Sequence, residues 1–260
     1  MKGVILAGGR GSRLFPLTKV ASKQLLPIYD KPLIYYPLST LMLAGIREIL
    51  IITTPDDHSN FKKLLSNGED FGLQINYELQ EQPQGLAQGI QIAGNFLAGD
   101  SFAFILGDNI FYGPGLGREL MNYKNVSGAQ IFGYRVSNPS DYGVAEINDS
   151  GKVISLEEKP QSPKSNIAVT GLYFYDAKAV DFVSSLRPSK RGELEITDLN
   201  KLYLEIDELN CTILPRGTAW LDTGTFNGLH DASTFVRLTE ERTGLRIGDP
   251  VEVAHIQGWI

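Results

Sequence analysis

Residues 3–14 read GVILAGGRGSRL, a short apolar run that leads directly into a glycine-rich loop. The run at residues 4–6 has no polar side chain, which is typical of a strand buried in a parallel sheet. Glycines within residues 8–11 allow positive φ and bring backbone N–H groups close to a bound anion. Arg10 and Arg13 add positive charge, and the guanidinium fork of Arg13 suits phosphate oxygens. The stretch therefore predicts a phosphate-binding loop at the end of the first strand.

Two common phosphate loops do not fit this stretch. A Walker A loop needs a lysine directly before its Ser or Thr, whereas Gly11 precedes Ser12 here. A dinucleotide-binding loop needs a third glycine where Leu14 stands, and Pro16 interrupts the helix that should follow. The sequence thus disfavours both a P-loop NTPase and an NAD(P)-dependent dehydrogenase.

The rest of the chain alternates apolar strands with amphipathic helices. In the first half we expect strands at 48–53, 73–79 and 102–106, and helices at 31–44, after Asp56-Asp57, and at 85–97. In the second half we expect strands at 130–136, 143–147, 152–156, 168–175 and 210–214, and helices at 177–186, 196–205 and 224–242. This alternation predicts an α/β fold, a three-layer αβα sandwich with a mostly parallel, Rossmann-like mixed sheet. No linker or repeat divides it, so we expect one domain over residues 1–260.

Composition excludes several classes of function. The net charge of −6 argues against bulk nucleic-acid binding. Cys211 is the single cysteine, which rules out an intrachain disulfide and favours a reducing compartment. Three scattered histidines form no zinc motif. We find neither a signal peptide nor an apolar run long enough to span a bilayer, and we expect a cytoplasmic protein with no membrane partner.

Charged side chains at predicted strand ends are candidates for chemistry. Asp108 and Asp222 each follow an apolar strand, and two such carboxylates suit Mg²⁺, which keeps several of its waters. Taken alone, each aspartate could equally cap the helix that follows it. Lys23 and Lys159, taken alone, could equally be solvated surface lysines. The residues by themselves leave these alternatives open.

The continuation of the loop resembles a known family. GGRGSRLFPLT (residues 8–18) and SKQLLP (residues 22–27) are similar to the signature of the sugar-nucleotide pyrophosphorylases. Further matches follow in chain order at residues 30–38, 106–109, 157–160, 169–173, 192–198 and 219–225. The resemblance covers most of the chain and is strongest to the branch that uses dTTP and glucose 1-phosphate.

This resemblance implies the nucleotide-diphospho-sugar transferase fold and a specific reaction. The products would be dTDP-glucose and pyrophosphate, Mg²⁺ would be the cofactor, and the product would supply dTDP-sugar biosynthesis such as that of dTDP-rhamnose. A UTP-using or other NTP-using enzyme of the same kind is the alternative. A sensor that binds nucleotide sugars without reaction ranks below both, because metal carboxylates and several phosphate-directed cations exceed what a binder needs.

The resemblance also implies a role for each matching position. The metal would be held by Asp108 and Asp222, and the catalytic set would be these two with Arg13, Lys23 and Lys159. Lys23 would meet the α-phosphate, Arg13 the departing pyrophosphate, and Lys159 the sugar phosphate. The nucleotide would contact Leu6, Gly8, Gly9, Gly11, Ser12, Arg13, Lys23, Gln24, Gln80, Gly85 and Asp108. The sugar would contact Asn109, Tyr142, Gly143, Glu158, Lys159, Val169 and Thr197.

Within this single domain we expect three parts: a nucleotide-binding part at about 1–110, a sugar-binding part at about 111–225 and a helical end at about 226–260.

Apolar residues between Leu245 and Ile260 have near-helical spacing, which predicts an amphipathic end helix. The longer family members continue for roughly a further helix pair that contributes to subunit contacts and a regulatory site. We expect a homo-oligomer, because a Trp259-Ile260 ending left in solvent suits a soluble protein poorly.

Overall fold

The computed structural model describes residues 1–9 and 11–260 and divides into two compact units. The first unit contains Lys2–Pro83, Ile105–Asn122 and Gly217–Ile260. The second unit contains Met1, Gln84–Phe104 and Tyr123–Arg216. Arg10, whose charge was assigned to the phosphate loop, lies outside the described residues. The three-part division predicted from the sequence stays a prediction.

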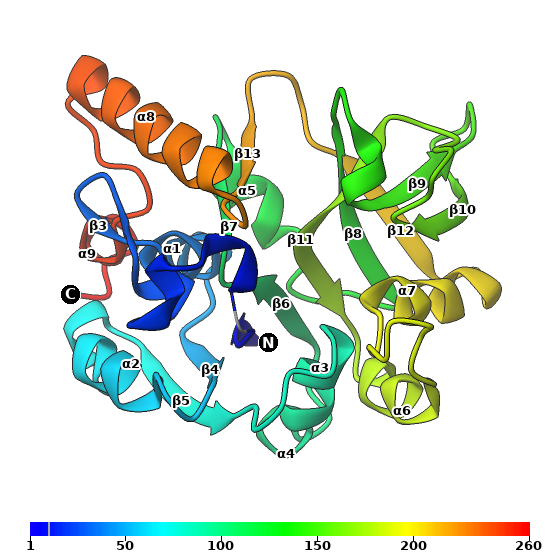
Figure 1. The fold of residues 1–260 in the computed structure, drawn as a ribbon, viewed down its shortest axis with the longest axis horizontal. Coiled ribbons are helices and arrows are strands. Elements are labelled where there is room, and N and C mark those ends of the chain that lie inside the picture. The colour runs from blue at the N-terminus through cyan, green and yellow to red at the C-terminus, as the bar shows by residue number, and fades with distance from the viewer. Residues whose placement is uncertain (10) are drawn as a thin grey trace. The chain divides into compact units, whose positions relative to one another are not determined.

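The first unit is built on parallel strands (Figure 1). β1 (Lys2–Ala7) pairs with β4 (Glu48–Thr53), and β4 pairs with β5 (Gln74–Leu79), both in parallel register. The last two residues of β6 (Phe102–Leu106) belong to this unit, and the strand order is β6-β1-β4-β5. Residues 4–7 are buried, as expected for the unbroken apolar run that opens the chain.

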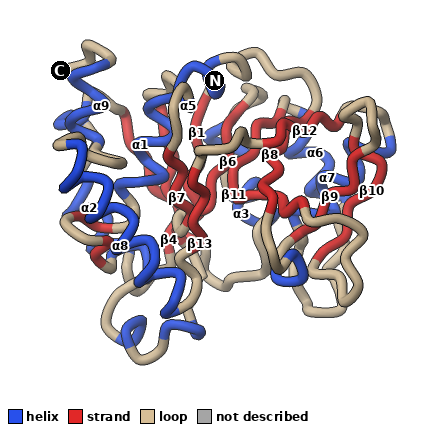
Figure 2. Tube along the Cα trace, turned by 90° about the horizontal axis from the view of Figure 1, so that it is seen from above, coloured by secondary structure: helices blue, strands red, loops and turns tan. Residues whose placement is uncertain are grey.

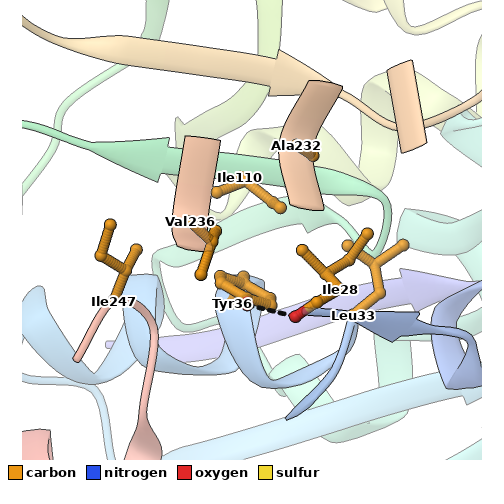
Figure 3. Packing of buried hydrophobic residues seen from close by; sticks show 7 residues of the cluster. All are labelled: Ile28, Leu33, Tyr36, Ile110, Ala232, Val236 and Ile247. Atoms are coloured by element: carbon orange, nitrogen blue, oxygen red, sulfur yellow. Dashed lines mark hydrogen bonds between the residues drawn. The ribbon is translucent and has the colours of Figure 1, made fainter. Parts of the chain in front are cut away.

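Helices and short strand pairs complete the first unit. The helices are α1 (Tyr35–Leu43), α2 (His58–Leu65), α5 (Leu116–Met121), α8 (Phe226–Thr243) and α9 (Pro250–Ile256), with 3-10 turns η1 (Ser12–Leu14), η2 (Leu17–Lys19), η3 (Lys23–Leu25) and η4 (Glu69–Phe71). The short strands are β2 (Pro27–Ile28), β3 (Lys31–Pro32), β7 (Asn109–Tyr112) and β13 (Ala219–Asp222). Figure 3 shows where α1, α8 and the β2–β3 hairpin meet: Tyr36 packs between Ile28 and Val236, and its hydroxyl donates to the Ile28 carbonyl at 2.8 Å.

The start of the predicted helix at 31–44 is wrong. Lys31 and Pro32 form β3, paired with β2, and α1 begins only at Tyr35. The Lys31 side chain is buried and makes ion pairs with Asp30 and Glu240, the latter at 3.0 Å. Because a buried ammonium needs nearby carboxylates, its pairing with α8 outweighs the local helical pattern.

The second unit contains the more antiparallel strands. β8 (Ala129–Arg135) and β9 (Gly143–Ile147) pair antiparallel with β11 (Ile167–Tyr175), and β10 (Val153–Glu158) pairs antiparallel with β9. β12 (Leu209–Ile213) pairs with β8 in parallel. The helical elements are α3 (Ala87–Ile92), α4 (Gly94–Leu97), the 3-10 turn η5 (Pro139–Asp141), α6 (Lys178–Ser185) and α7 (Ile196–Glu205). In Figure 2, α6 and α7 lie together beside the strands of this unit, and α7 packs on β10 and β12.

The predicted α/β class with a mixed sheet and flanking helices is confirmed. The predicted helix at 85–97 begins only at Ala87, because residues 84 and 85 are hydrogen-bonded or packed against Leu194, and it divides at Ala93 into α3 and α4. An end helix exists as α9, with Asp249 at its N-cap accepting from Val251 N at 2.9 Å. Trp259 packs against Gly72 and the Arg47 guanidinium of its own unit, so this indole is not left in solvent. Among the helices of residues 1–9 and 11–260, none has the length and apolarity needed to cross a bilayer.

Candidate active site

The glycine-rich loop has the backbone shape that the sequence predicts. Gly9 has φ +103° and Gly11 has φ +55°, both in the region that disfavours side chains. Gly8 has no room for one, because a Cβ there would lie 2.0 Å from Oε1 of Gln80. Ser12 begins η1, directly after Gly11. Gln80, which is predicted to contact the nucleotide, therefore lies against the loop.

Arg13 and Lys23 reach the same part of the first unit as the two predicted metal carboxylates. A Cβ on Gly224 would lie 2.7 Å from Nη2 of Arg13 and 3.0 Å from Oδ1 of Asp222. Nζ of Lys23 makes an ion pair with Asp108, and both side chains are mostly buried. The structure thus brings together four of the five predicted catalytic residues.

A long-range contact fixes the segment that carries Lys23. The Asp57 carboxylate accepts a hydrogen bond from Ser22 N at 2.9 Å, between residues 35 positions apart. Asp57 stands at the N-cap of α2, as the sequence suggests, yet its side chain makes no capping bond. Gln24 is buried and packs near Leu6, since a Cβ on Gly107 would lie 2.9 Å from Leu6 O and 3.0 Å from Gln24 Cγ.

The two carboxylates meet through the pairing of β7 with β13. Asp222 lies opposite Asn109 in this antiparallel pair. Thr223 donates to the Asp108 carbonyl twice, through N at 3.1 Å and through Oγ1 at 2.8 Å, across 115 positions of sequence. Gly224 N donates to Oδ1 of Asp222 at 2.9 Å and orients that carboxylate.

Electrostatics separate the two aspartates. Burial and the charge of Asp108 raise the pKa of Asp222 above its ordinary value. Burial alone would raise the pKa of Asp108 as well, but the charge and hydrogen bond of Lys23 lower it below its ordinary value. A cation bound between the two carboxylates would stabilise the charged form of Asp222.

This donor set fits Mg²⁺. Hard divalent cations take oxygen ligands, and Mg²⁺ is commonly bound by one or two carboxylates plus waters and substrate phosphates. Within residues 1–9 and 11–260 there is no cluster of three or more His, Cys, Asp and Glu able to hold a metal. A site of two carboxylates completed by water and phosphate is the arrangement that Asp108 and Asp222 allow.

Asn109 connects this pair to the buried indole of Trp220. Trp220 Nε1 donates to Asn109 Oδ1 at 2.6 Å, and Asn109 Nδ2 donates to Asp108 Oδ1 at 3.1 Å. The amide of Asn109 is therefore fixed by a core aromatic. No role for Trp220 follows from the sequence alone, because a tryptophan flanked by apolar residues is indistinguishable from an ordinary core residue.

Apart from Asn109, the predicted sugar-binding residues lie in the second unit. A Cβ on Gly143 would lie 3.1 Å from Thr197 Oγ1, 3.4 Å from Glu158 Oε2 and 3.9 Å from Val169 Cβ. Thr197 Oγ1 donates to Glu158 Oε2 at 2.5 Å. The β9–β10 register places Glu158 opposite Gly143, and Lys159 N donates to the Tyr142 carbonyl at 3.0 Å. Because Gly143 has no side chain, the Glu158 carboxylate and the Thr197 hydroxyl can lie this close to its backbone.

Arg191 is a member of this cluster that sequence reasoning missed. Its Nη2 lies 3.3 Å from Oε1 of Glu158, while Nζ of Lys159 lies 4.0 Å from the same oxygen. Two cations therefore flank the predicted sugar-binding carboxylate. The available signal was its place in the sequence, since Arg191 directly precedes the stretch 192–198 that carries the resemblance.

Gly85 belongs to the second unit, where its loop is tied to Leu194. Leu194 N donates to the Gln84 carbonyl at 2.7 Å, and Ala87 N donates to the Leu194 carbonyl at 3.1 Å. Gly85 has φ +109°, and a Cβ on it would lie 2.4 Å from Leu194 O. Only glycine fits this position. The backbone around Gly85 is thereby hydrogen-bonded to the segment that carries Thr197.

Comparisons with known proteins agree with this arrangement. The family model for Nucleotidyl transferase matches residues 2–238. Glucose-1-phosphate thymidylyltransferase of Mycolicibacterium smegmatis is 57% identical over 260 residues, covering 100% of this chain and 90% of the relative. The enzyme of the same name from Neisseria meningitidis is 54% identical over 261 residues, covering 100% and 91%.

Solved structures give the same family and fold. A Bacillus anthracis protein described as a glucose-1-phosphate thymidylyltransferase, solved with sucrose, has a TM-score of 0.84 at 40% identity and covers 91% of this chain and 95% of its own. A UDP-glucose pyrophosphorylase solved with UDP-glucose has a TM-score of 0.80 at 26% identity, covering 92% and 98%. With its glycine-rich loop, paired carboxylates and full-length relatives, the chain belongs to the nucleotidyl transferase family of enzymes, among the glucose-1-phosphate thymidylyltransferases.

Proposed function

We propose that the enzyme makes dTDP-glucose and pyrophosphate from dTTP and α-D-glucose 1-phosphate. The observation that carries this proposal is the buried Asp108–Asp222 pair with Lys23 and Arg13 beside it. Carboxylates that favour a divalent cation, next to two fixed cations, suit a nucleoside triphosphate. The names of the relatives supply the identity of the two substrates.

The chemistry is an in-line substitution at phosphorus. An anionic phosphate oxygen of glucose 1-phosphate attacks the α-phosphorus of dTTP, a new P–O bond forms, and the bond to the β-phosphate oxygen breaks. Pyrophosphate leaves with that electron pair, so neither a protein nucleophile nor a general base is needed. The protein accelerates the reaction by positioning the two substrates and by stabilising the charge that develops on pyrophosphate.

The residues of the first unit divide that work. Lys23 would neutralise the α-phosphate, and Arg13 would offer its guanidinium fork to the charge that develops on pyrophosphate. Mg²⁺ bound by Asp108 and Asp222 would supply positive charge to the phosphate oxygens. Gln80 would contact the base edge, and Gly85, for which the same role is proposed, lies in the second unit.

The residues of the second unit would hold the sugar phosphate. Glu158 would accept hydrogen bonds from sugar hydroxyls, and the Thr197 hydroxyl beside it would contact the same sugar. Lys159 and Arg191 would contact the phosphate, because both cations lie within 4.0 Å of Glu158, the predicted sugar-binding carboxylate. Asn109 is the predicted sugar contact that lies in the first unit.

Nucleotide choice tests this proposal directly. We expect glucose 1-phosphate to react with dTTP at a higher kcat/KM than with UTP, CTP or ATP in an initial-rate assay of pyrophosphate release. A preference for UTP would assign the enzyme to the alternative, UTP-using activity. The structural likeness to a UDP-glucose pyrophosphorylase is the reason to include UTP in the assay. Binding of nucleotide sugar without any pyrophosphate exchange would instead support a sensor.

Replacing Lys159 by alanine should act on one substrate. We expect Lys159→Ala to raise the KM for glucose 1-phosphate about tenfold, which corresponds to about 1.4 kcal/mol, with the KM for dTTP nearly unchanged. The side chain is about half exposed, so folding should be unaffected. Initial rates with each substrate varied in turn measure both constants. An unchanged KM for glucose 1-phosphate and unchanged kcat would remove Lys159 from the site.

We also infer a cytoplasmic homo-oligomer that supplies dTDP-sugar biosynthesis, such as that of dTDP-rhamnose. The single cysteine, Cys211, suits a reducing compartment. Apolar side chains between residues 245 and 260 are exposed, at Leu245, Val251, Ile256 and Ile260, which supports their burial against another subunit. We expect neither a nucleic-acid nor a membrane partner.

A further inference from the structure

Glu195 is a buried carboxylate at the end of the RGELE segment (residues 191–195). The residue is 6% exposed and stands at the N-cap position of α7, where its side chain makes no capping bond. Instead it accepts from Nε of Arg191 at 3.2 Å, from Nη2 of Arg191 at 2.8 Å and from Ser189 Oγ at 2.7 Å. Its carboxylate thus accepts hydrogen bonds from both an arginine fork and a hydroxyl.

Such a pair fixes the orientation of a guanidinium. A carboxylate that accepts from both Nε and Nη2 holds the planar fork in one orientation, which a single ion contact does not. The backbone of residues 189–193 supports it, because Ser189 N donates to the Glu193 carbonyl at 2.8 Å and Arg191 N donates to Ser189 Oγ at 3.2 Å. Nη2 of the fixed guanidinium also faces Glu158, at 3.3 Å.

The charges explain why this orientation matters. In the proposed function, Glu158 keeps lone pairs free for sugar hydroxyls. Without a fixed orientation, the Arg191 guanidinium would be free to form its ion pair with an exposed carboxylate instead. Glu193 offers such an alternative, because its Oε2 lies 3.4 Å from Nη2 of Arg191 and its side chain is 47% exposed. Glu195 takes the larger share of the arginine's hydrogen bonds and leaves Nη2 directed toward Glu158.

We propose that Glu195 is a positioning residue for the sugar-phosphate site, acting by holding Arg191 beside Glu158. This inference rests on the proposed function of the second-unit cluster. It assigns to Glu195 no contact with substrate. Its effect on the reaction passes through Arg191 alone.

A matched pair of variants tests the role of Glu195. Glu195→Gln keeps the side-chain shape but removes the charge, and we expect the KM for glucose 1-phosphate to rise about tenfold with the KM for dTTP unchanged. Glu193→Gln changes an acid that contacts the same guanidinium from the surface, and both constants should stay within twofold of the parent's. Equal effects of the two variants would overturn the proposal.

A double variant separates this inference from the function on which it rests. If Glu195 acts through Arg191, Glu195→Gln should have no further effect on the glucose 1-phosphate KM in an Arg191→Ala background. Additive effects would show that Glu195 acts elsewhere and would overturn the inference alone. If Arg191→Ala itself left this KM unchanged, the proposed phosphate role of Arg191 would fail instead.

Ser189→Ala keeps the question answerable should Glu195→Gln fail to fold. It removes one neutral donor to the Glu195 carboxylate, and we expect a smaller rise in the glucose 1-phosphate KM, about threefold. The dTTP KM should again be unchanged. A Ser189→Ala enzyme with parental KM values for both substrates would overturn the proposal that Glu195 holds Arg191 in position.

Discussion

Asp222→Asn should lose about 10²–10³ in Mg²⁺-dependent turnover while the protein melts at the same or a higher temperature. Asparagine removes the carboxylate charge that a metal needs. Burial and the charge of Asp108 raise the pKa of the Asp222 carboxyl, so its charged form is unfavourable in the folded state. Asparagine has no such charge, and the folded state loses the repulsion with Asp108. Initial rates over a Mg²⁺ titration and a thermal melt measure the two effects.

Asp108→Asn should lose as much activity but also some stability. Asp108 is the partner of Lys23, and its removal leaves a mostly buried ammonium without that carboxylate. Its melting temperature should therefore fall below that of Asp222→Asn. The control is Asp56→Asn, which changes an exposed aspartate of the same unit and should match the parent in both assays. Near-parental turnover of either active-site variant at limiting Mg²⁺ would remove that residue from the metal site.

Arg13→Ala should lower kcat by about 10²–10³ and raise either KM far less. The charge that Arg13 would stabilise develops on pyrophosphate as it leaves, so the interaction is stronger in the transition state than in the bound substrates. Its guanidinium lies beside Gly224 and Asp222, at the paired carboxylates. Steady-state kinetics with both substrates varied give kcat and both KM values.

Arg13→Lys is the informative comparison for this position. Lysine restores a positive charge but not the planar fork, so we expect it to recover only part of kcat. A variant Arg13→Ala that changed the KM for dTTP alone, with kcat intact, would show that Arg13 binds ground-state nucleotide and does not act on the leaving group.

Local pattern was sufficient for much of the fold. The apolar run at residues 4–6 predicted a buried parallel strand, and residues 196–205 form a helix with the bounds expected from spacing. The positive φ of Gly9 and Gly11 follows from the residue type in a loop that only glycine tolerates well. Such features depend on neighbours within a few positions, and these the sequence displays.

Candidate site residues came from a different kind of sequence information. No periodicity marks Lys23, Lys159 or Asp108 as more than a surface or capping residue. The ordered resemblance from residue 8 to residue 225 singled them out, and the structure then placed Lys23 on Asp108 and Thr197 on Glu158. Their catalytic roles stay predictions.

Only the tertiary structure decided how distant segments pair. The sequence by itself determined the strand-and-loop opening, the α/β class and the residues to examine. It could not determine that β7 and β13 bring Asp108 to Asp222, that Asp57 binds Ser22, or that Glu195 holds Arg191. The reason is physical: a four-residue strand or a buried ion pair is stable only through partners far along the chain. Local propensity depends on neighbouring residues and not on those distant partners, so the pairing is determined only in the folded structure.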